Sequence, residues 1–307
     1  MRIKTVSFIS SVVLAILVAS VSAFGQGNTI YNVIPSPLAG NYPSQAFQAQ
    51  QASEVGDRAA FVTPGRALTT VTVTMSSWAC ENGHWTTFCT TTPGATFSHP
   101  ITINIYSVGP FNSVGSLIAT KTQTQTIPYR PSTDAVCGDG RWSNGTACFN
   151  GKAANVTFDL TSQNITLPNQ VIVGIAYNTS NYGANPIGVK PCSSTVEGCP
   201  YDSLNVALVN PVLTQTAGLN PSPNDAYFDS ETAGNYCDGG AGGVGSFRLD
   251  PGAGCWTGFK PSIKINAGNP PANANQCKNN GWQTFTRADG STFKNQGDCI
   301  QYVNTGK

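Results

Sequence analysis

The chain has 307 residues, a formal net charge of +1 and only 10% charged residues. Charged side chains usually make up about 25% of a soluble domain, so amide and hydroxyl side chains supply much of the polarity here. Such a balance gives no electrostatic basis for binding nucleic acid or an anionic membrane surface.

The N-terminus has the pattern of an export signal. Arg2 and Lys4 precede an apolar run from Val12 to Val18, and the small residues that follow end in Val21-Ser22-Ala23. This order of basic, apolar and small residues is typical of a cleaved secretory signal. The apolar stretch is too short and too rich in serine for a membrane-spanning helix, which needs roughly 20 apolar residues. We therefore expect residues 1–23 to be removed, which leaves 14 basic against 15 acidic side chains, and the protein to be secreted with no transmembrane segment in its mature part.

Alternating apolar and polar residues dominate the rest of the chain. Val71-Thr72-Val73-Thr74-Met75 and Ile101-Thr102-Ile103-Asn104-Ile105 each place apolar side chains on one face of a strand. Six further segments rich in β-branched and aromatic residues predict strands: 117–126, 156–160, 171–177, 204–209, 247–249 and 259–265. No segment shows the apolar spacing of a helix. About eight such strands predict an all-β, antiparallel two-sheet sandwich, jelly-roll-like in form.

The ten cysteines all follow the export signal and fall into five local couples. An even number of cysteines in an exported chain indicates disulfides, and sequential pairing is the simplest connectivity. The chain has no C-x-x-C pair and only two histidines, so zinc is not expected. The pairs expected are Cys80–Cys89, Cys137–Cys148, Cys192–Cys199, Cys237–Cys255 and Cys277–Cys299. Most lie in Gly- and Pro-rich connections, which predicts long loops stapled onto a rigid scaffold, the usual arrangement of a binding surface.

The mature chain divides into three predicted parts. Residues 24–265 form the sandwich. Residues 266–275 lack apolar periodicity and contain Pro270-Pro271, which indicates a linker. Residues 276–307 form a small disulfide module, because about 30 residues bury little core without a bridge.

Several long sequence words resemble a family of secreted bacterial proteins of unknown function. They include Gly40-Asn41-Tyr42-Pro43-Ser44, Glu54-Val55-Gly56-Asp57, the stretch from Thr70 to Trp78, and Pro93-Gly94-Ala95-Thr96-Phe97-Ser98-His99-Pro100. The C-terminal stretch from Cys277 to Cys299 is similar to a short module of exported bacterial proteins. These resemblances imply bacterial export and a β domain, and they bring no activity and no site residues.

Two groups of carboxylates are candidates for a site. Asp225, Asp229 and Glu231 form one group, and Glu54 and Asp57 form the other. Hydrated turn residues are the leading interpretation of both. Calcium ligation is the first alternative, since Ca²⁺ takes six to eight oxygen ligands, and no other cofactor is expected. Asp229 and Glu231 are also candidates for glycoside hydrolysis, which needs two carboxyl groups about 5 to 9 Å apart.

Trp85 and Trp142 are candidate ligand-binding residues. They lie inside predicted disulfide loops, where an exposed ring can stack on a sugar face. For any single tryptophan, packing on a disulfide is the more common role. His84 and His99 are expected at the surface and in a local hydrogen bond, respectively, and not in catalysis. Gly240-Ala241-Gly242-Gly243-Val244-Gly245 matches a dinucleotide-binding string, but it lies in a disulfide loop without the required helix.

The sequence thus favours a non-catalytic extracellular sandwich that binds a polysaccharide or another cell-envelope component. A carboxylate-dependent polysaccharide hydrolase and a purely structural envelope or matrix protein are the two alternatives.

Overall fold

The computed structural model describes residues 28–63, 65–188, 199–252 and 254–307. The predicted export signal (residues 1–23) and Cys192 lie outside these ranges. In the described part of the chain, no helix is long and apolar enough to cross a membrane.

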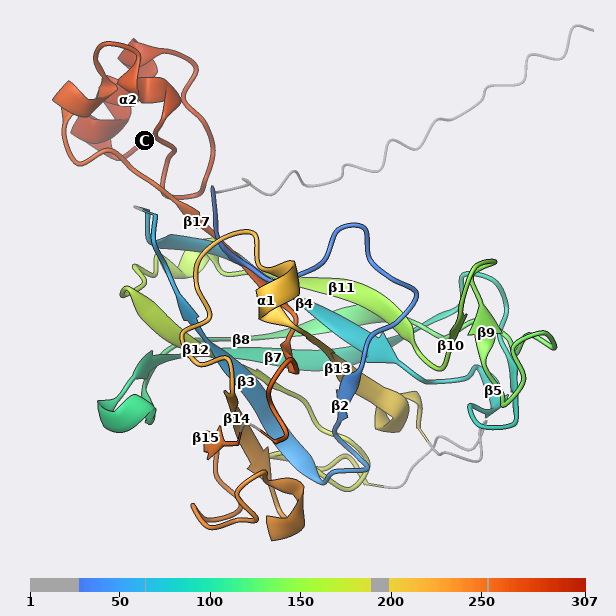
Figure 1. Ribbon diagram of the computed structural model, residues 1–307. Coiled ribbons are helices and arrows are strands. Elements are labelled where there is room, and N and C mark those ends of the chain that lie inside the picture. Colours follow the sequence, from blue (N-terminus) through green and yellow to red (C-terminus); the bar gives the residue numbers. More distant parts are fainter. Residues whose placement is uncertain (1–27, 64, 189–198, 253) are drawn as a thin grey trace, which may run out of the picture.

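The body of the protein consists of two antiparallel sheets, as the alternating sequence pattern predicts (Figure 1). The first sheet has the order β1 (Asn28–Asn32), β17 (Ile263–Gly268), β4 (Ala67–Ser77), β13 (Leu204–Val209) and β16 (Lys260–Pro261), with β11 (Lys152–Asp159) beside β4 and β2 (Ser44–Ala46) beside β13. The second has the order β15 (Arg248–Pro251), β14 (Asp225–Ser230), β3 (Ala52–Ala60), β12 (Gln170–Ala176), β7 (Thr96–Val108) and β8 (Val114–Pro128). The predicted sandwich is confirmed.

The core lies between the sheets. The apolar positions of the two strongest alternating segments are fully buried in one cluster: Val71, Val73 and Met75 of β4, and Ile101, Ile103 and Ile105 of β7. Because side chains alternate along a strand, the intervening polar positions point away from this core. The outer face of the second sheet therefore carries Glu54 of β3, Asn104 of β7 and Asp229 of β14.

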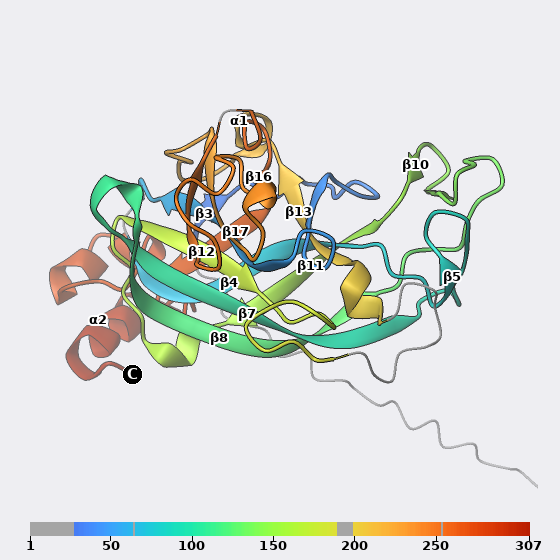
Figure 2. The same ribbon diagram turned by 90° about the horizontal axis from the view of Figure 1, so that it is seen from below.

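The loops at one end of the sandwich carry two small hairpins. Their strands are β5 (Asn82–His84) with β6 (Phe88–Thr90), and β9 (Trp142–Ser143) with β10 (Cys148–Phe149). Figure 2 shows that β7 and β8 run the length of the molecule, from near the C-terminal module to the end that carries β5 and β10. The remaining short elements are α1 (Pro211–Thr214) and the 3-10 turns η1 (Pro110–Asn112), η2 (Thr161–Gln163), η3 (Pro200–Ser203), η4 (Ala233–Asn235), η5 (Ala274–Cys277) and η6 (Gly281–Gln283).

Four of the predicted disulfides are present: Cys80–Cys89, Cys137–Cys148, Cys237–Cys255 and Cys277–Cys299. The fifth predicted pair includes Cys192, which lies outside the described residues. Sequential pairing therefore holds wherever both cysteines are described.

The C-terminal residues form a small unit with its own core. Cys277, Phe293 and Cys299 are buried together, and Trp282, Phe285 and Tyr302 pack against them. This unit contains helix α2 (Gln296–Thr305), so the expectation that no helix is present is wrong here. Of the α2 residues only Cys299 is buried, which is why no apolar stripe marks the helix in the sequence. The Asn295 side chain accepts a hydrogen bond from the Asp298 backbone at the N-terminus of α2, and Gly306 ends the helix in a left-handed conformation.

Strand β17 joins the sandwich to this unit and extends three residues beyond the expected end of the domain at Ile265. Ala267 and Gly268 still pair with Leu68 and Ala67 of β4. Just after the strand, Asn269 exchanges hydrogen bonds with Thr286, at 2.7 and 3.0 Å. Residues of both the sandwich and the unit, such as Leu68 and Arg287, line a cleft of about 400 Å³. The unit therefore lies beside the main domain (Figure 1).

Candidate functional site

A pocket of about 270 Å³ opens where β4 ends and the β5–β6 hairpin begins. It combines aromatic side chains with short polar ones. Its lining residues are Ser44, Ala46, Ala49, Trp78, Trp85, Asp202, Ser203 and Asn205. Ligand pockets commonly pair apolar walls with a few fixed polar groups, and we call this the tryptophan pocket.

The two tryptophans form one aromatic corner. The rings of Trp78 and Trp85 meet edge to face, with centroids 4.7 Å apart and planes at 80°. Trp78 follows β4 directly, and its indole Nε1 donates to the Ser76 hydroxyl at 3.0 Å. His84 stacks against Trp85, with centroids 5.6 Å apart. Edge-to-face contact is a favoured aromatic geometry, so the two rings fix each other's orientation.

The other lining residues supply hydrogen-bonding groups from separate strands. Asn205 of β13 donates to the Ser44 hydroxyl of β2 at 3.2 Å. Asp202 in η3 accepts hydrogen bonds from the backbone and the hydroxyl of Ser180, both at 2.7 Å. These contacts hold an amide and a carboxylate beside the aromatic corner. Rigid positioning of this kind lowers the entropy cost of binding.

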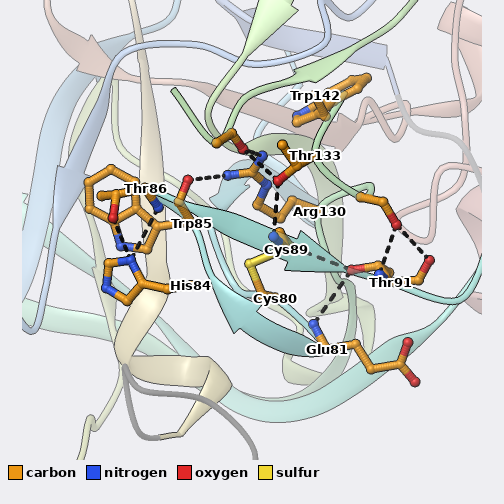
Figure 3. Close-up of a disulfide and its surroundings, with 12 residues drawn as sticks. Cys80, Glu81, His84, Trp85, Thr86, Cys89, Thr91, Arg130, Thr133 and Trp142 are labelled. Atoms are coloured by element: carbon orange, nitrogen blue, oxygen red, sulfur yellow. Dashed lines mark hydrogen bonds between the residues drawn. A yellow bond between two sulfur atoms is a disulfide. The ribbon is translucent and has the colours of Figure 1, made fainter. Parts of the chain in front are cut away.

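A buried arginine positions the loop that carries Trp85 (Figure 3). The Arg130 side chain is fully buried. Its Nη1 donates to the Trp85 carbonyl at 2.9 Å, and its Nη2 donates to the Gly140 carbonyl. Thr133 also donates to the Gly140 carbonyl, at 3.1 Å, and its hydroxyl accepts from the Cys89 backbone at 2.9 Å. Arg130 thus ties the Cys80–Cys89 hairpin to the Cys137–Cys148 loop.

Replacement of Arg130 by methionine is expected to lower the free energy of unfolding by about 3 kcal/mol, because charge-assisted hydrogen bonds to two carbonyls are lost. Urea denaturation followed by circular dichroism measures the change. The control is Arg141→Met in the neighbouring loop, which loses an exposed 3.6 Å ion pair with Asp139 and one hydrogen bond to the Cys137 carbonyl from a side chain that is 38% exposed, and which is expected to cost about 1 kcal/mol. Equal effects of the two substitutions would show that Arg130 does not have this role.

Trp142, the second tryptophan singled out from the sequence, is a packing residue. It is only 4% exposed. Its Nε1 donates to the Gly151 carbonyl at 2.6 Å, its ring packs on Phe149, and the Lys152 ammonium lies over it. Its faces are therefore covered by protein, and the expectation of an exposed stacking surface at Trp142 does not fit the structure. Trp85 is half-buried and lines the pocket.

The structure separates Glu54 from Asp57. Both lie on β3, but an odd spacing along a strand places two side chains on opposite faces. Glu54 points to the outer face, whereas Asp57 points inward and is 2% exposed. Burial, opposed mainly by Lys260, raises the pKa of Asp57 to about 7. Asn220 donates to Asp57 at 2.5 Å, so Asp57 belongs to a buried polar network.

The second carboxylate group is also spread out. Asp225 and Asp229 lie on β14 four residues apart, about 13 Å along a strand. Glu231 follows the end of β14 and is exposed. Asp229 instead lies directly opposite Glu54 in the pairing of β14 with β3. The structure therefore brings together Glu54 and Asp229, one residue from each predicted group.

The positions of these carboxylates can be compared with the calcium sites expected from the sequence. Among the described residues, no group of three or more His, Cys, Asp or Glu side chains could hold a metal ion. The two groups proposed from the sequence do not form, because strand geometry divides Glu54 from Asp57 and distance divides Asp225 from Asp229.

The two histidines have different surroundings. His84 is half-buried beside Trp85, and its Nδ1 lies 2.6 Å from the Thr86 hydroxyl. His99 is buried, and its Nε2 lies 2.9 Å from the Asn178 carbonyl. Burial lowers the pKa of His99 to about 4, so its imidazole is neutral at physiological pH. The hydrogen bond of His99 reaches a distant segment and is not the local one expected.

Comparison with known proteins adds no relative. No family model, curated protein or solved structure matches this chain. We therefore infer the function from the chemistry of the residues.

Sequence reasoning missed most of the tryptophan pocket. Trp78, Asp202 and Asn205 come from separate parts of the chain, and only folding brings them together. One signal was present, since Trp78 lies two residues before Cys80, where the stapled hairpin that carries Trp85 begins.

Proposed function

We propose that this protein is a secreted polysaccharide-binding protein and that the tryptophan pocket is its binding site. A pyranose ring has an apolar C–H face and a rim of hydroxyl groups. An aromatic wall with amide, hydroxyl and carboxylate groups beside it complements both parts. The observation that carries the proposal is the corner of Trp78 and Trp85 over Ser44, Asp202 and Asn205.

The charge of the chain supports a neutral ligand. The sequence is almost electrically balanced and poor in charged residues. Long-range attraction to a highly charged polymer is therefore weak. A neutral glycan with many hydroxyl groups fits the pocket better than an anionic polymer does.

Three observations support an extracellular location. The N-terminal residues have the order of a secretory signal. Four disulfides lie in the described residues, and such bonds persist in oxidising compartments. The resemblance to exported bacterial proteins points the same way. The proposed partner is therefore a polysaccharide of the cell envelope or of the surroundings.

The proposal predicts that Trp85→Ala weakens binding to insoluble polysaccharides at least about 10-fold, since loss of an aromatic platform removes 1.4 kcal/mol or more. Pull-down of the oxidised protein with cellulose, xylan, chitin and bacterial cell-wall material measures binding. The matched control is Phe88→Ala in the same hairpin, because Phe88 is 65% exposed and does not line the pocket. Binding that is unchanged in Trp85→Ala, or absent in the wild type for every glycan, contradicts the proposal.

A further inference from the structure

A second cleft, of about 340 Å³, lies on the outer face of the second sheet. Residues from four adjacent strands line it, including Asp229 of β14, Glu54 of β3, Ala176 of β12 and Thr102 of β7. Their backbones stand in one row across the sheet, since Glu54 is paired with both Asp229 and Ala176, and Ala176 with Thr102. The cleft is therefore built on regular strands, which place side chains more rigidly than loops do.

The Glu54 carboxyl group is held at the bottom of this cleft. Its Oε1 accepts a hydrogen bond from the Asn104 amide at 3.1 Å, and the Tyr106 hydroxyl lies 3.2 Å from both of its oxygens. The Glu54 side chain is 8% exposed. It crosses Gly174 of β12, where a Cβ atom would overlap the carboxyl group. The missing side chain at position 174 thus creates the space that Glu54 occupies.

Asp229 faces Glu54 across the β3–β14 pairing. Directly opposed residues of antiparallel strands have Cβ atoms about 4.5–5.5 Å apart and project on the same face. The Asp229 Oδ1 atom is buried and accepts no hydrogen bond from the described residues. A buried oxygen without a donor costs free energy, and this disfavours the charged form of Asp229.

The two carboxyl groups have perturbed protonation. Burial, with a smaller contribution from the nearby Asp229, raises the pKa of Glu54 to about 7, against the opposing hydrogen bonds from Asn104 and Tyr106. Burial and the exposed Glu231 raise the pKa of Asp229. From β12, the residues that face Glu54 are Gly174 and Ala176, which carry no charge. Glu54 therefore carries a proton for a large fraction of the time at neutral pH.

The contacts favour acid–base chemistry over cation binding. Both Glu54 oxygens already face N–H or O–H donors, whereas Ca²⁺ requires six to eight oxygens that face the ion. Of the described residues that line the cleft, Glu54 and Asp229 are the two with carboxyl groups. The Glu54 carboxyl turns toward Asn104 and Tyr106 of β7 and away from β14.

We propose that Glu54 and Asp229 are the general acid and general base of a glycoside hydrolysis site. This activity goes beyond binding, and its substrate class, a polysaccharide, rests on the proposed function. In a single displacement, Glu54 donates its proton to the glycosidic oxygen as the bond from that oxygen to C1 breaks. Asp229 takes a proton from water as the water oxygen bonds to C1, and the proton then returns to Glu54 through solvent. One water is consumed, and two hydroxyl-bearing products leave.

Two segments of the chain carry residues of both sites. Asn178 lines the cleft, and two residues later Ser180 donates to Asp202 of the tryptophan pocket. On the other side, Ala49 lines the pocket and Ser53 lines the cleft. Binding and hydrolysis are tested by separate variants, because no described residue lines both sites.

The test measures the release of reducing ends from the same polysaccharides by the full, oxidised protein. Glu54→Gln and Asp229→Asn are each expected to lower the rate at least about 100-fold, the lower end of the contribution of general acid–base catalysis. The matched control is Asp225→Asn, because Asp225 lies on the same strand as Asp229 and does not line the cleft, and it is expected to stay within about 3-fold of the wild type. The wild-type rate should fall as the pH rises above about 7, where Glu54 loses its proton.

Each outcome separates hydrolysis from binding. Glu54→Gln should still bind polysaccharide in the pull-down, because Glu54 lies outside the tryptophan pocket. A wild type that binds but releases no reducing ends overturns the hydrolysis and leaves binding intact. Release that persists in Glu54→Gln or in Asp229→Asn overturns the assigned roles.

Discussion

Reduction of the disulfides is expected to unfold the protein or to bring it close to unfolding. The four bridges in the described residues join cysteines 9, 11, 18 and 22 positions apart. A loop of this size contributes about 2–4 kcal/mol by restricting the unfolded chain. Together the four approach the whole stability of an ordinary domain, about 5–15 kcal/mol. The urea midpoint, followed by near-ultraviolet circular dichroism with and without a phosphine reductant, measures the loss.

The double variant Cys277→Ser/Cys299→Ser is the control for this experiment. These two residues belong to the small core of the C-terminal unit, which is separate from the core of the sandwich. The variant should loosen helix α2. It should change the free energy of unfolding of the sandwich by no more than a surface substitution does, about 0.5 kcal/mol. A midpoint that reductant does not change would contradict the structural role of the bridges, and so would free thiols at the four pairs in mass mapping.

The folded protein is expected to be more stable at about pH 5 than at about pH 8. The pKa values of Glu54 and Asp57 rise to about 7 from ordinary values of 4.5 and 3.8, in both cases mainly through burial. Between the ordinary and the raised values the folded state binds more protons than the unfolded state. The free energy of unfolding therefore falls as the pH rises through this window. At 1.36 kcal/mol per pKa unit, the raised pKa of each carboxyl lowers the free energy of unfolding by about 3–4 kcal/mol across this whole window.

Thermal denaturation at a series of pH values measures this slope, and Asp57→Asn tests its origin. The variant should lose about half of the slope, since one of the two carboxyl groups is gone. Asp139→Asn is the control, as the Asp139 side chain is 90% exposed. A stability that rises from about pH 5 to pH 8 would contradict the assignment.

The alternating pattern predicted the framework of the fold. Val71, Val73 and Met75 point into the core as expected, and so do the isoleucines of β7. Such strands can be found from sequence because one face is apolar and the other polar. Local cysteine spacing likewise predicted the four described bridges.

Strand β3 was missed for a physical reason that concerns the site itself. Its residues Glu54, Asp57 and Arg58 are charged yet buried, because β3 lies inside a sheet and their partners come from other elements. Charges at these positions erase the apolar alternation that marks a strand. Glu54, which we propose as the general acid, is one of these residues.

Long-range pairing limited what could be predicted of both sites. Glu54 and Asp229 became partners only through the pairing of β3 with β14. Trp85 was identified as a candidate, but its neighbour Trp78 and the polar groups from β2, β13 and η3 required the fold. Trp142 had an equally suggestive position in the sequence, and burial gave it a packing role.

We propose that a glycan binds against Trp78 and Trp85. The most direct measurement records the indole N–H resonances of ¹⁵N-tryptophan-labelled protein during titration with an oligosaccharide from the polysaccharide that binds best. Binding in the tryptophan pocket should shift the resonances of Trp78 and Trp85 and leave those of Trp142 and Trp256 unchanged, since these two residues are 4% and 5% exposed. Shifts confined to Trp282, which packs in the C-terminal unit, or the absence of any shift at saturation would contradict it.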